Sequence, residues 1–191
     1  MRLSTRSSRA KEPPDWPGPG QAPRTSAEAQ ALFDALPAVG VEDMLGSWRG
    51  WGLATGHSLD GLLENAHWLG KRFEDAETVH PLVFENRRGE AISVEPGVLI
   101  PALAWLDSLS MLRSRAAGTL FQAILPLLAT RRGRARLRLL NHRGVQTAAM
   151  LYDHLPIVDV FRRLDHGWLL GEMDLKGQRN PFYFLLQKSE S

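Results

Sequence analysis

The stretch Leu45-Gly-Ser-Trp-Arg-Gly-Trp-Gly52 decides the fold of this chain. It holds two tryptophans and three glycines within eight residues, and glycine costs about 1 kcal/mol in the interior of a helix. Within a strand, glycine is typical of a bulge, a sharp bend or the close approach of another backbone. We therefore expect a short strand with a crowded neighbour, and we expect it to begin a β-rich body.

Further strands are predicted downstream of this stretch. In residues 134–139, arginine alternates with alanine and leucine, which predicts a strand with one buried face. Residues 79–85 and 90–94 flank a four-residue loop that ends in Gly89, as in a β-hairpin. Strands are also predicted at residues 68–73, 145–152, 168–175 and 182–187. Tight turns at this spacing indicate an antiparallel sheet, curled or closed into a barrel.

Helices are expected before this sheet and over it. Residues 26–36 carry an apolar stripe, with Thr25 or Ser26 as the cap. Helices are also predicted at residues 59–67 and at 157–164, where Pro156 occupies the first helical position. The fold class is therefore α+β and β-rich, an antiparallel curled sheet or lipocalin-like barrel with an N-terminal helix and covering helices.

Composition excludes several classes of protein. The chain has 191 residues, 43% of them hydrophobic, with six tryptophans and a formal charge of +2, which is enough apolar material for one cored domain. It has no cysteine, so disulfides, thiol nucleophiles and cysteine-ligated metals are excluded. No apolar run approaches the roughly 20 residues of a membrane span, and the basic N-terminus lacks the apolar core of a secretory signal. We expect a cytoplasmic protein.

Several motifs together resemble a known family. Gly46-Ser-Trp-Arg-Gly50 matches the GXWXG pattern, and Trp68, Gly70-Lys-Arg-Phe73 and Val79-His-Pro-Leu82 follow it in order. Matching motifs near the C-terminus are Met150-Leu-Tyr-Asp153, Pro156-Ile-Val-Asp159, Gly171-Glu-Met-Asp174 and Pro181-Phe-Tyr-Phe184. Over residues 28–188 the chain resembles GXWXG proteins with a C-terminal domain of unknown function 4334. The resemblance implies no particular activity. The glycine–any–tryptophan pattern is also similar to lipocalin-like barrels, in which the tryptophan plugs one end.

These observations predict four segments. Residues 1–25 are rich in serine, arginine, proline and glycine and are expected to form a disordered tail. Residues 26–95 form the GXWXG domain, and residues 96–130 form an apolar, partly helical connector. Residues 131–188 supply the strands that complete one β-rich body.

A ligand pocket is predicted inside this body. Small-molecule pockets are mostly apolar, with a few placed polar groups. If residues 68–73 alternate regularly, Arg72 shares a face with Trp68, and an inward arginine could hold a carboxylate or phosphate. The alternative for Arg72 is an ion pair with an aspartate of the family motifs, and tryptophans could equally be packed core. The predicted ligand-binding residues are Trp48, Trp51, Trp68, Arg72 and Tyr152.

Candidate proton carriers are His80, Asp153 and Asp174. His80 precedes Pro81 at a strand end, where a barrel opens. Asp174 shares a face with Glu172, and if that face is interior, the acids would need Arg72 or Lys71 as partners. The alternative is that Asp153 and Asp174 cap turns. No metal-binding spacing of histidines and no nucleotide-binding or nucleophile motif occurs, so no metal or cofactor is expected.

The arginines of residues 131–138 offer another type of partner. They could bind nucleic acid or an anionic surface, although a solvated outer face that protects an edge strand fits better. We favour binding of a small hydrophobic or amphipathic molecule in an interior pocket. The alternatives are a cofactor-free isomerase, lyase or hydrolase that uses a pocket His or Asp, and arginine-mediated binding to nucleic acid or an anionic surface. The oligomeric state is left open.

Overall fold

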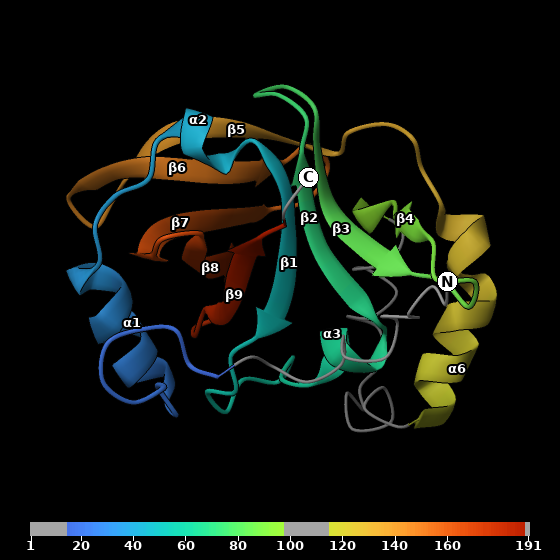
Figure 1. Cartoon of the computed structure of the whole chain (residues 1–191), viewed down its shortest axis with the longest axis horizontal. Coiled ribbons are helices and arrows are strands. Elements are labelled where there is room, and N and C mark those ends of the chain that lie inside the picture. The colour runs from blue at the N-terminus through green and yellow to red at the C-terminus, as the bar shows by residue number, and fades with distance from the viewer. Residues whose placement is uncertain (1–14, 98–114, 190–191) are drawn as a thin grey trace, which may run out of the picture.

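A computed structural model describes residues 15–97 and 115–189 and contains a closed antiparallel β-barrel (Figure 1). The strands in these ranges are β1 (Gly46–Gly52), β2 (Trp68–Phe73), β3 (Val79–Glu85), β4 (Ala91–Ser93), β5 (Ala135–His142), β6 (Val145–Tyr152), β7 (Ile157–Asp165), β8 (Trp168–Leu175) and β9 (Phe182–Lys188). Their order is β2-β1-β9-β8-β7-β6-β5-β3-β4, and β2 also pairs with β3. That last pairing closes eight strands into the barrel and leaves β4 as a hairpin partner of β3. The predicted β-rich barrel is confirmed.

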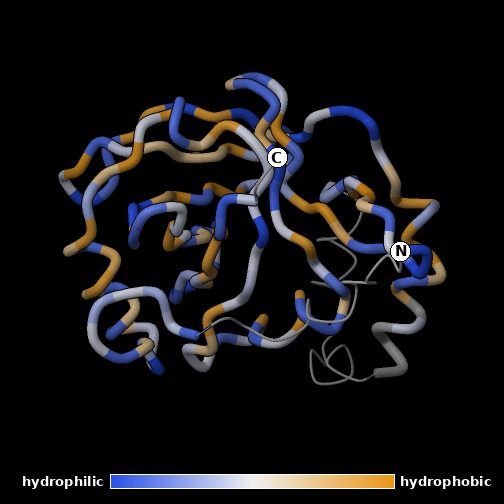
Figure 2. Tube along the Cα trace, viewed as in Figure 1, coloured by the Kyte–Doolittle hydropathy of each residue, from blue (hydrophilic) through white to orange (hydrophobic). Residues whose placement is uncertain are grey.

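Alternating side chains divide the barrel wall into an inner and an outer face. On β9, for example, Phe182, Phe184 and Leu186 belong to the inner core, whereas Tyr183 and Leu185 belong to a second core on the outside. Figure 2 shows hydrophobic and hydrophilic residues interspersed along the strands. The inner core is rich in large aromatic side chains, so the barrel is lined mainly by apolar groups.

The outer core lies beneath the N-terminal helix α1 (Ser26–Ala35). Thr25 and Glu28 form a capping box that begins α1, and Ala29 and Phe33 are completely buried against the wall. Of the segment predicted as a disordered tail, the structure describes residues 15–25, and Trp16 packs on this outer core.

Short helices mark the two ends of β1 (Figure 1). α2 (Val41–Met44) precedes β1, and α3 (Leu62–Asn65) lies between β1 and β2. α3 is shorter than the predicted helix at residues 59–67. α6 (Arg115–Ile124) and a 3₁₀ turn, η1 (Leu125–Leu128), stand beside β3 and β4. The described end of the predicted connector is therefore helical, while residues 98–114 lie outside the described ranges.

The prediction of a helix at residues 157–164 is wrong, because β7 occupies this segment. Its inner face carries Ile157 and Phe161, and its outer face carries Val160 and Leu164. Since α1 covers the outer face, both faces of β7 are largely apolar, and the polar–apolar alternation that marks a strand is lost. Pro156 lies just before the strand, where its missing N–H removes no ladder hydrogen bond.

Candidate functional site

A bulge at Gly70 turns Lys71 into the barrel. The register between β2 and β3 shifts on both sides of Gly70, and Gly70 has φ of 137°. A Cβ atom at this position would lie 1.9 Å from the carbonyl oxygen of Trp48, so only glycine fits. The bulge restarts the alternation, because Lys71 and Phe73 now face inward and Arg72 faces outward.

Lys71 forms an ion pair with Asp159 of β7 in the barrel interior. Lys71 Nζ lies 2.7 Å from Asp159 Oδ2, and the two side chains are 3% and 1% exposed. Lys71 Nζ also donates a hydrogen bond to the Pro81 carbonyl oxygen at 3.2 Å. Neither Asp159 oxygen accepts a hydrogen bond of good geometry from residues 15–97 and 115–189, and Lys71 Nζ is the ion-pair partner of Oδ2 there. We refer to these two residues as the Lys71–Asp159 pair.

Aromatic rings surround the Lys71–Asp159 pair. Lys71 Nζ lies 4.8 Å from the ring centre of Phe184, 5.6 Å from that of Trp68 and 6.0 Å from that of Tyr152. Burial raises the pKa of Asp159, although Lys71 opposes the shift. Burial and the charge of Asp159 likewise raise the pKa of the Tyr152 hydroxyl. A carboxyl group that resists ionisation can bind or transfer a proton.

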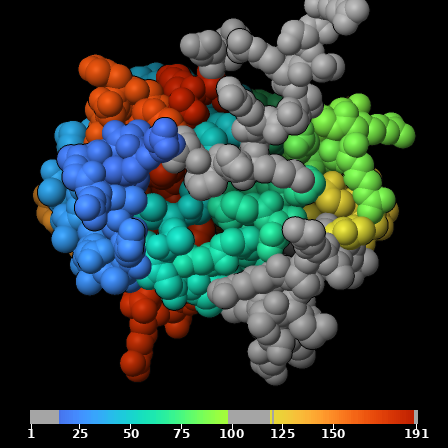
Figure 3. Space-filling model, turned by 60° about the horizontal axis from the view of Figure 1, so that its bottom comes forward, coloured from blue at the N-terminus to red at the C-terminus, as the bar shows by residue number. Residues whose placement is uncertain are grey.

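A second feature, which we call the mouth pocket, opens at the α3 end of the barrel. Figure 3 brings this end forward, with residues of the β1–α3–β2 segment across it and the C-terminal strands visible between them. The pocket offers about 30 Å³ that a water-sized group can enter, room for one small polar group. It is lined by Arg49, Gly50, Trp51, Glu64, His67, Trp68, Leu69 and Glu85.

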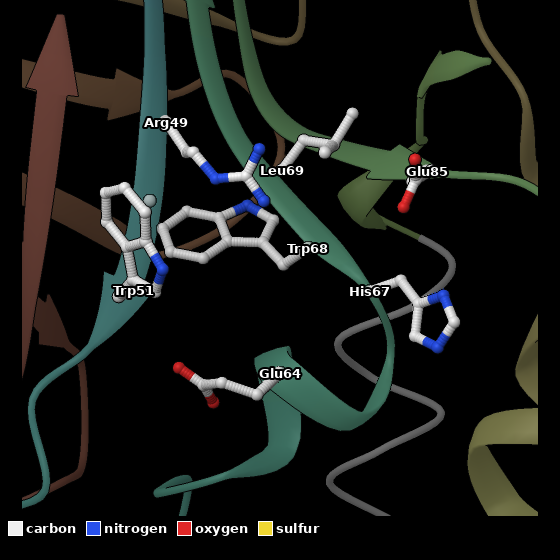
Figure 4. Close-up of a pocket in the computed structure, with 8 residues that line it drawn as sticks. Arg49, Trp51, Glu64, His67, Trp68, Leu69 and Glu85 are labelled. Atoms are coloured by element: carbon white, nitrogen blue, oxygen red, sulfur yellow. The ribbon is translucent and has the colours of Figure 1, made fainter. Parts of the chain in front are cut away.

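Glycine in the family motif shapes the mouth pocket. A Cβ atom on Gly50 would lie 2.3 Å from the Trp68 ring, so the indole packs directly on the bare backbone of β1. Figure 4 shows the Trp51 and Trp68 rings side by side, with Glu64 pointing toward them from α3. Trp68 also belongs to the inner core and packs edge-on against Phe184 at 6.1 Å. One indole therefore separates the mouth pocket from the Lys71–Asp159 pair.

Two buried polar atoms at this pocket are left unsatisfied. Trp68 Nε1 has no acceptor, and Glu64 Oε2 has no donor, among the residues that the structure describes. The other Glu64 oxygen accepts a hydrogen bond from the Gly52 backbone N–H at 2.6 Å, which fixes the carboxylate. His67 has φ of 61°, a left-handed conformation that is unfavourable for histidine and common at functional sites. Two residues that line the pocket thus carry a buried donor and a buried acceptor without partners among the described residues.

The predicted ligand-binding residues occupy different places. Trp68 and Tyr152 line the interior beside Lys71, and Trp51 lines the mouth pocket while packing on Trp168 at 5.7 Å. Trp48 is buried in the inner core, and its Nε1 donates to the Met44 carbonyl oxygen at 2.6 Å. The expectation that Arg72 faces inward with Trp68 is wrong. Arg72 is 45% exposed on the outer face and pairs with Glu74 at 3.0 Å, and the inward cation is Lys71.

The predicted proton carriers lie outside the barrel interior. His80 sits opposite Arg72 in the ladder and is 1% exposed, with Nε2 3.1 Å from Glu74. Burial and the charge of Arg72 lower the pKa of His80, although Glu74 opposes them. Asp153 is partly exposed, 3.6 Å from Arg136. Asp174 is exposed on β8. These residues are not brought together.

Glu172 is buried on the outer face, so the condition under which it would pair with Arg72 or Lys71, an interior face, is not met. It accepts hydrogen bonds from Arg143 at 2.8 and 2.6 Å and from the Tyr183 hydroxyl at 2.9 Å, and His142 Nε2 lies 2.9 Å away. Burial alone would raise the pKa of Glu172, but these partners outweigh it and lower the pKa to about 2.

Three arginines in β5 and just before it form ion pairs on the outer face. Arg134 pairs with Glu95, Arg136 with Asp153 and Arg138 with Glu77. Such pairing weakens the positive potential that nucleic acid requires. In the described ranges, no group of three or more acidic or histidine side chains could hold a metal ion. No described helix is both long and apolar enough to cross a membrane.

Sequence reasoning did not name Asp159, Glu64 or His67 as site residues, and it named Lys71 only as a possible partner of buried acids. A signal existed for two of them, because Lys71 follows Gly70 and Asp159 ends the motif Pro156-Ile-Val-Asp159. The alternation of polar and apolar residues, however, does not predict the bulge at Gly70. Glu64 and His67 reach the pocket only through the short helix α3 and the turn after it.

Comparison with known proteins links these residues to two sequence families. Residues 31–89 match the family described as "GXWXG protein", and residues 133–188 match the "Domain of unknown function (DUF4334)". A solved crystal structure of a protein from Thermomonospora curvata is similar, with 34% sequence identity and a TM-score of 0.64, covering 86% of this chain and 87% of that chain. No curated protein matches the chain. The first matched segment contributes Lys71 and the second contributes Asp159, so the ion pair joins the two.

Proposed function

Because the chain belongs to the GXWXG proteins that carry a C-terminal domain of unknown function 4334, we propose a function for the barrel that its two segments build together. The barrel binds a small hydrophobic or amphipathic molecule, which enters at the mouth pocket. The observation that carries this proposal is the combination of the Trp51 and Trp68 rings with a buried donor and a buried acceptor that lack partners in the described residues.

Physical chemistry supports this combination as a binding site. Leaving a buried donor or acceptor unpaired costs about 1–3 kcal/mol. Trp68 Nε1 and Glu64 Oε2 therefore destabilise the folded chain unless a ligand group or water forms a hydrogen bond with them. Indole rings supply a flat apolar surface for the body of the ligand. Because the pocket admits only a small group, a longer ligand must extend toward solvent or displace the Trp68 ring into the barrel.

Indole N–H signals in the NMR spectrum of the ¹⁵N-labelled full chain test this proposal. Addition of 4-ethylphenol or its methyl ether, 4-ethylanisole, is expected to shift the Trp51 and Trp68 signals saturably. The Trp48 signal serves as a reference, since its N–H is already bonded to Met44. Trp68→Phe is expected to weaken binding, whereas Trp16→Phe on the outer wall is the matched control. Unmoved Trp51 and Trp68 signals up to the solubility limit of both compounds would reject the proposal.

Proton transfer in the interior is a second candidate function, favoured by one specific observation. Asp159 combines a raised pKa with an oxygen that accepts no hydrogen bond from any residue in the described ranges. The carboxylate form of such a group is a stronger base than an ordinary carboxylate, and it can remove a proton next to a carbonyl group and become the carboxylic acid. Deuterium exchange into cyclohexanone, followed by NMR in D₂O, should then be faster with the chain than without it and should return to the buffer rate for Asp159→Asn. Equal rates with and without the chain would exclude this candidate for that probe.

A further inference from the structure

The Lys71–Asp159 pair has an incomplete set of hydrogen bonds. An ammonium group has three protons. In Lys71, Asp159 Oδ2 and the Pro81 carbonyl oxygen lie within hydrogen-bonding distance, and the ring of Phe184 lies 4.8 Å from Nζ. The donors of Lys71 are thereby accounted for. Neither oxygen of Asp159 accepts a hydrogen bond of good geometry from residues 15–97 or 115–189; Oδ2 has the ion-pair contact with Lys71, and Oδ1 is a buried acceptor with no donor from these residues.

Charge balance restricts what can approach this oxygen. The pair is neutral as a whole and is surrounded by aromatic side chains, where an additional unpaired charge is strongly disfavoured. An anionic ligand would have to displace Asp159 from Lys71, and a cationic ligand would compete with Lys71 for Asp159. A neutral group with a polarised hydrogen needs neither exchange, because it donates to Oδ1 and leaves the ion pair intact.

The Trp68 side chain is the barrier between the mouth pocket and the pair. Its indole lies between the mouth pocket and Lys71, 5.6 Å from Nζ. Within the described part of the chain no hydrogen bond holds Trp68 Nε1, so packing on the Gly50 backbone and on the Phe184 ring is what keeps the indole in place. Rotation of this one side chain would connect the pocket to the interior.

We infer that the ligand of the barrel is a neutral, hydroxyl-bearing apolar molecule of the phenol or alcohol class, and that its hydroxyl group donates to Asp159 Oδ1. This inference rests on the proposed function and specifies the chemistry of the ligand. Phe184, Trp68 and Tyr152 form the apolar walls around the hydroxyl group. The pair therefore selects the polar end, while the aromatic side chains bind the body.

Three compounds with one skeleton separate the hydrogen bond from the charge. The full chain is titrated with 4-ethylphenol, 4-ethylanisole and 4-ethylbenzoate, using calorimetry and the Trp68 indole signal. We expect 4-ethylphenol to bind about tenfold more tightly than 4-ethylanisole, as for one buried hydrogen bond to a charged acceptor, and 4-ethylbenzoate to bind most weakly. Equal affinities for the phenol and the anisole would overturn the inference while leaving the proposed function in place. Binding of none of the three would reject the proposed function itself.

Variants of the pair identify the atom that accepts the hydroxyl. In the double variant Lys71→Met with Asp159→Leu, the phenol and the anisole are expected to bind equally. Glu64→Gln should keep the tenfold preference, and so should Asp165→Asn at the exposed end of β7. Loss of the preference in Glu64→Gln alone would place the hydroxyl in the mouth pocket and overturn the inference.

A single variant provides a test that does not require the apolar double replacement to fold. Asp159→Asn leaves the Lys71 charge without its carboxylate. The order of affinities should then reverse, with 4-ethylbenzoate binding most tightly. An unchanged order in a folded Asp159→Asn protein, judged from its indole spectrum, would show that the pair does not contact the ligand and would overturn the inference.

Discussion

Two buried carboxylates on neighbouring strands differ in almost everything except burial. Asp159 on β7 and Glu172 on β8 are 1% and 2% exposed. Asp159 faces the interior, has Lys71 as its one ion-pair partner among residues 15–97 and 115–189, and has a raised pKa. Glu172 faces outward beneath α1, has Arg143, Tyr183 and His142 as partners, and has a pKa of about 2.

The number of donors, rather than burial, separates these two acids. Hydrogen bonds to a carboxylate stabilise its charged form and can outweigh the cost of desolvation. Glu172 has enough of them to connect β8, β9 and the β5–β6 turn, and Arg143 extends the network to Asp34 on α1 at 2.7 Å. We interpret Glu172 as a structural residue. Asp159 retains an acceptor oxygen that no donor in the described ranges meets, which is the expected property of a group that binds a ligand.

Removal of Glu172 is the most direct way to test this contrast, and it has the largest expected effect. Glu172→Ala should lower the free energy of unfolding by about 4 kcal/mol, because it leaves the Arg143 charge and the buried Tyr183 hydroxyl without their partner. Urea denaturation at pH 7 measures the change. Asp174→Ala, exposed on the same strand, is the control and should change stability by less than about 0.5 kcal/mol. Similar losses in both variants would contradict a structural role for Glu172.

The two carboxylates should change the free energy of unfolding in opposite directions as the pH is lowered. The pKa of Glu172 falls from 4.5 to about 2 on folding, so its contribution is complete above pH 4.5 and is lost as the pH falls toward 2. The contribution is about 3 kcal/mol, and it should be absent in Glu172→Gln. The pKa of Asp159 instead rises above 3.8 on folding. The free energy of unfolding, relative to that of Asp159→Asn, should therefore decrease as the pH increases from 3.8 toward the raised pKa of Asp159. Urea midpoints at several pH values check both signs, and parallel curves for the two variants would refute the contrast.

The barrel could be predicted from the sequence, but its polar centre could not. Alternation in β5 and glycine-containing turns between strands are local signals, and they correctly predicted most strands. β7 was missed because α1 packs on its outer face, and that contact is not visible in a two-residue pattern.

The identity of the inward cation depended on one backbone conformation. Regular alternation assigns Arg72 to the face of Trp68, whereas the bulge at Gly70 exchanges it for Lys71. The bulge requires glycine because the Trp48 carbonyl lies against the Gly70 backbone, a contact between residues 22 positions apart in sequence (70 − 48). Sequence reasoning did anticipate that an inward cation could pair with an aspartate of the family motifs, without identifying the two residues.

Replacement of both members of the Lys71–Asp159 pair has the smallest expected effect on stability. It separates a role of the pair in folding from a role in ligand binding. Asp159→Leu alone should destabilise the fold by about 3 kcal/mol, since an unpaired lysine would remain among aromatic side chains. Adding Lys71→Met removes that charge. The free energy of unfolding of the double variant should then lie within about 1 kcal/mol of that of the unchanged chain. Urea denaturation of the two single variants and the double variant yields the coupling energy between the two residues. If the double variant is as unstable as Asp159→Leu, the pair maintains the fold, as Glu172 does. If stability recovers while the preference for 4-ethylphenol is lost, the fold does not need the pair and ligand binding does.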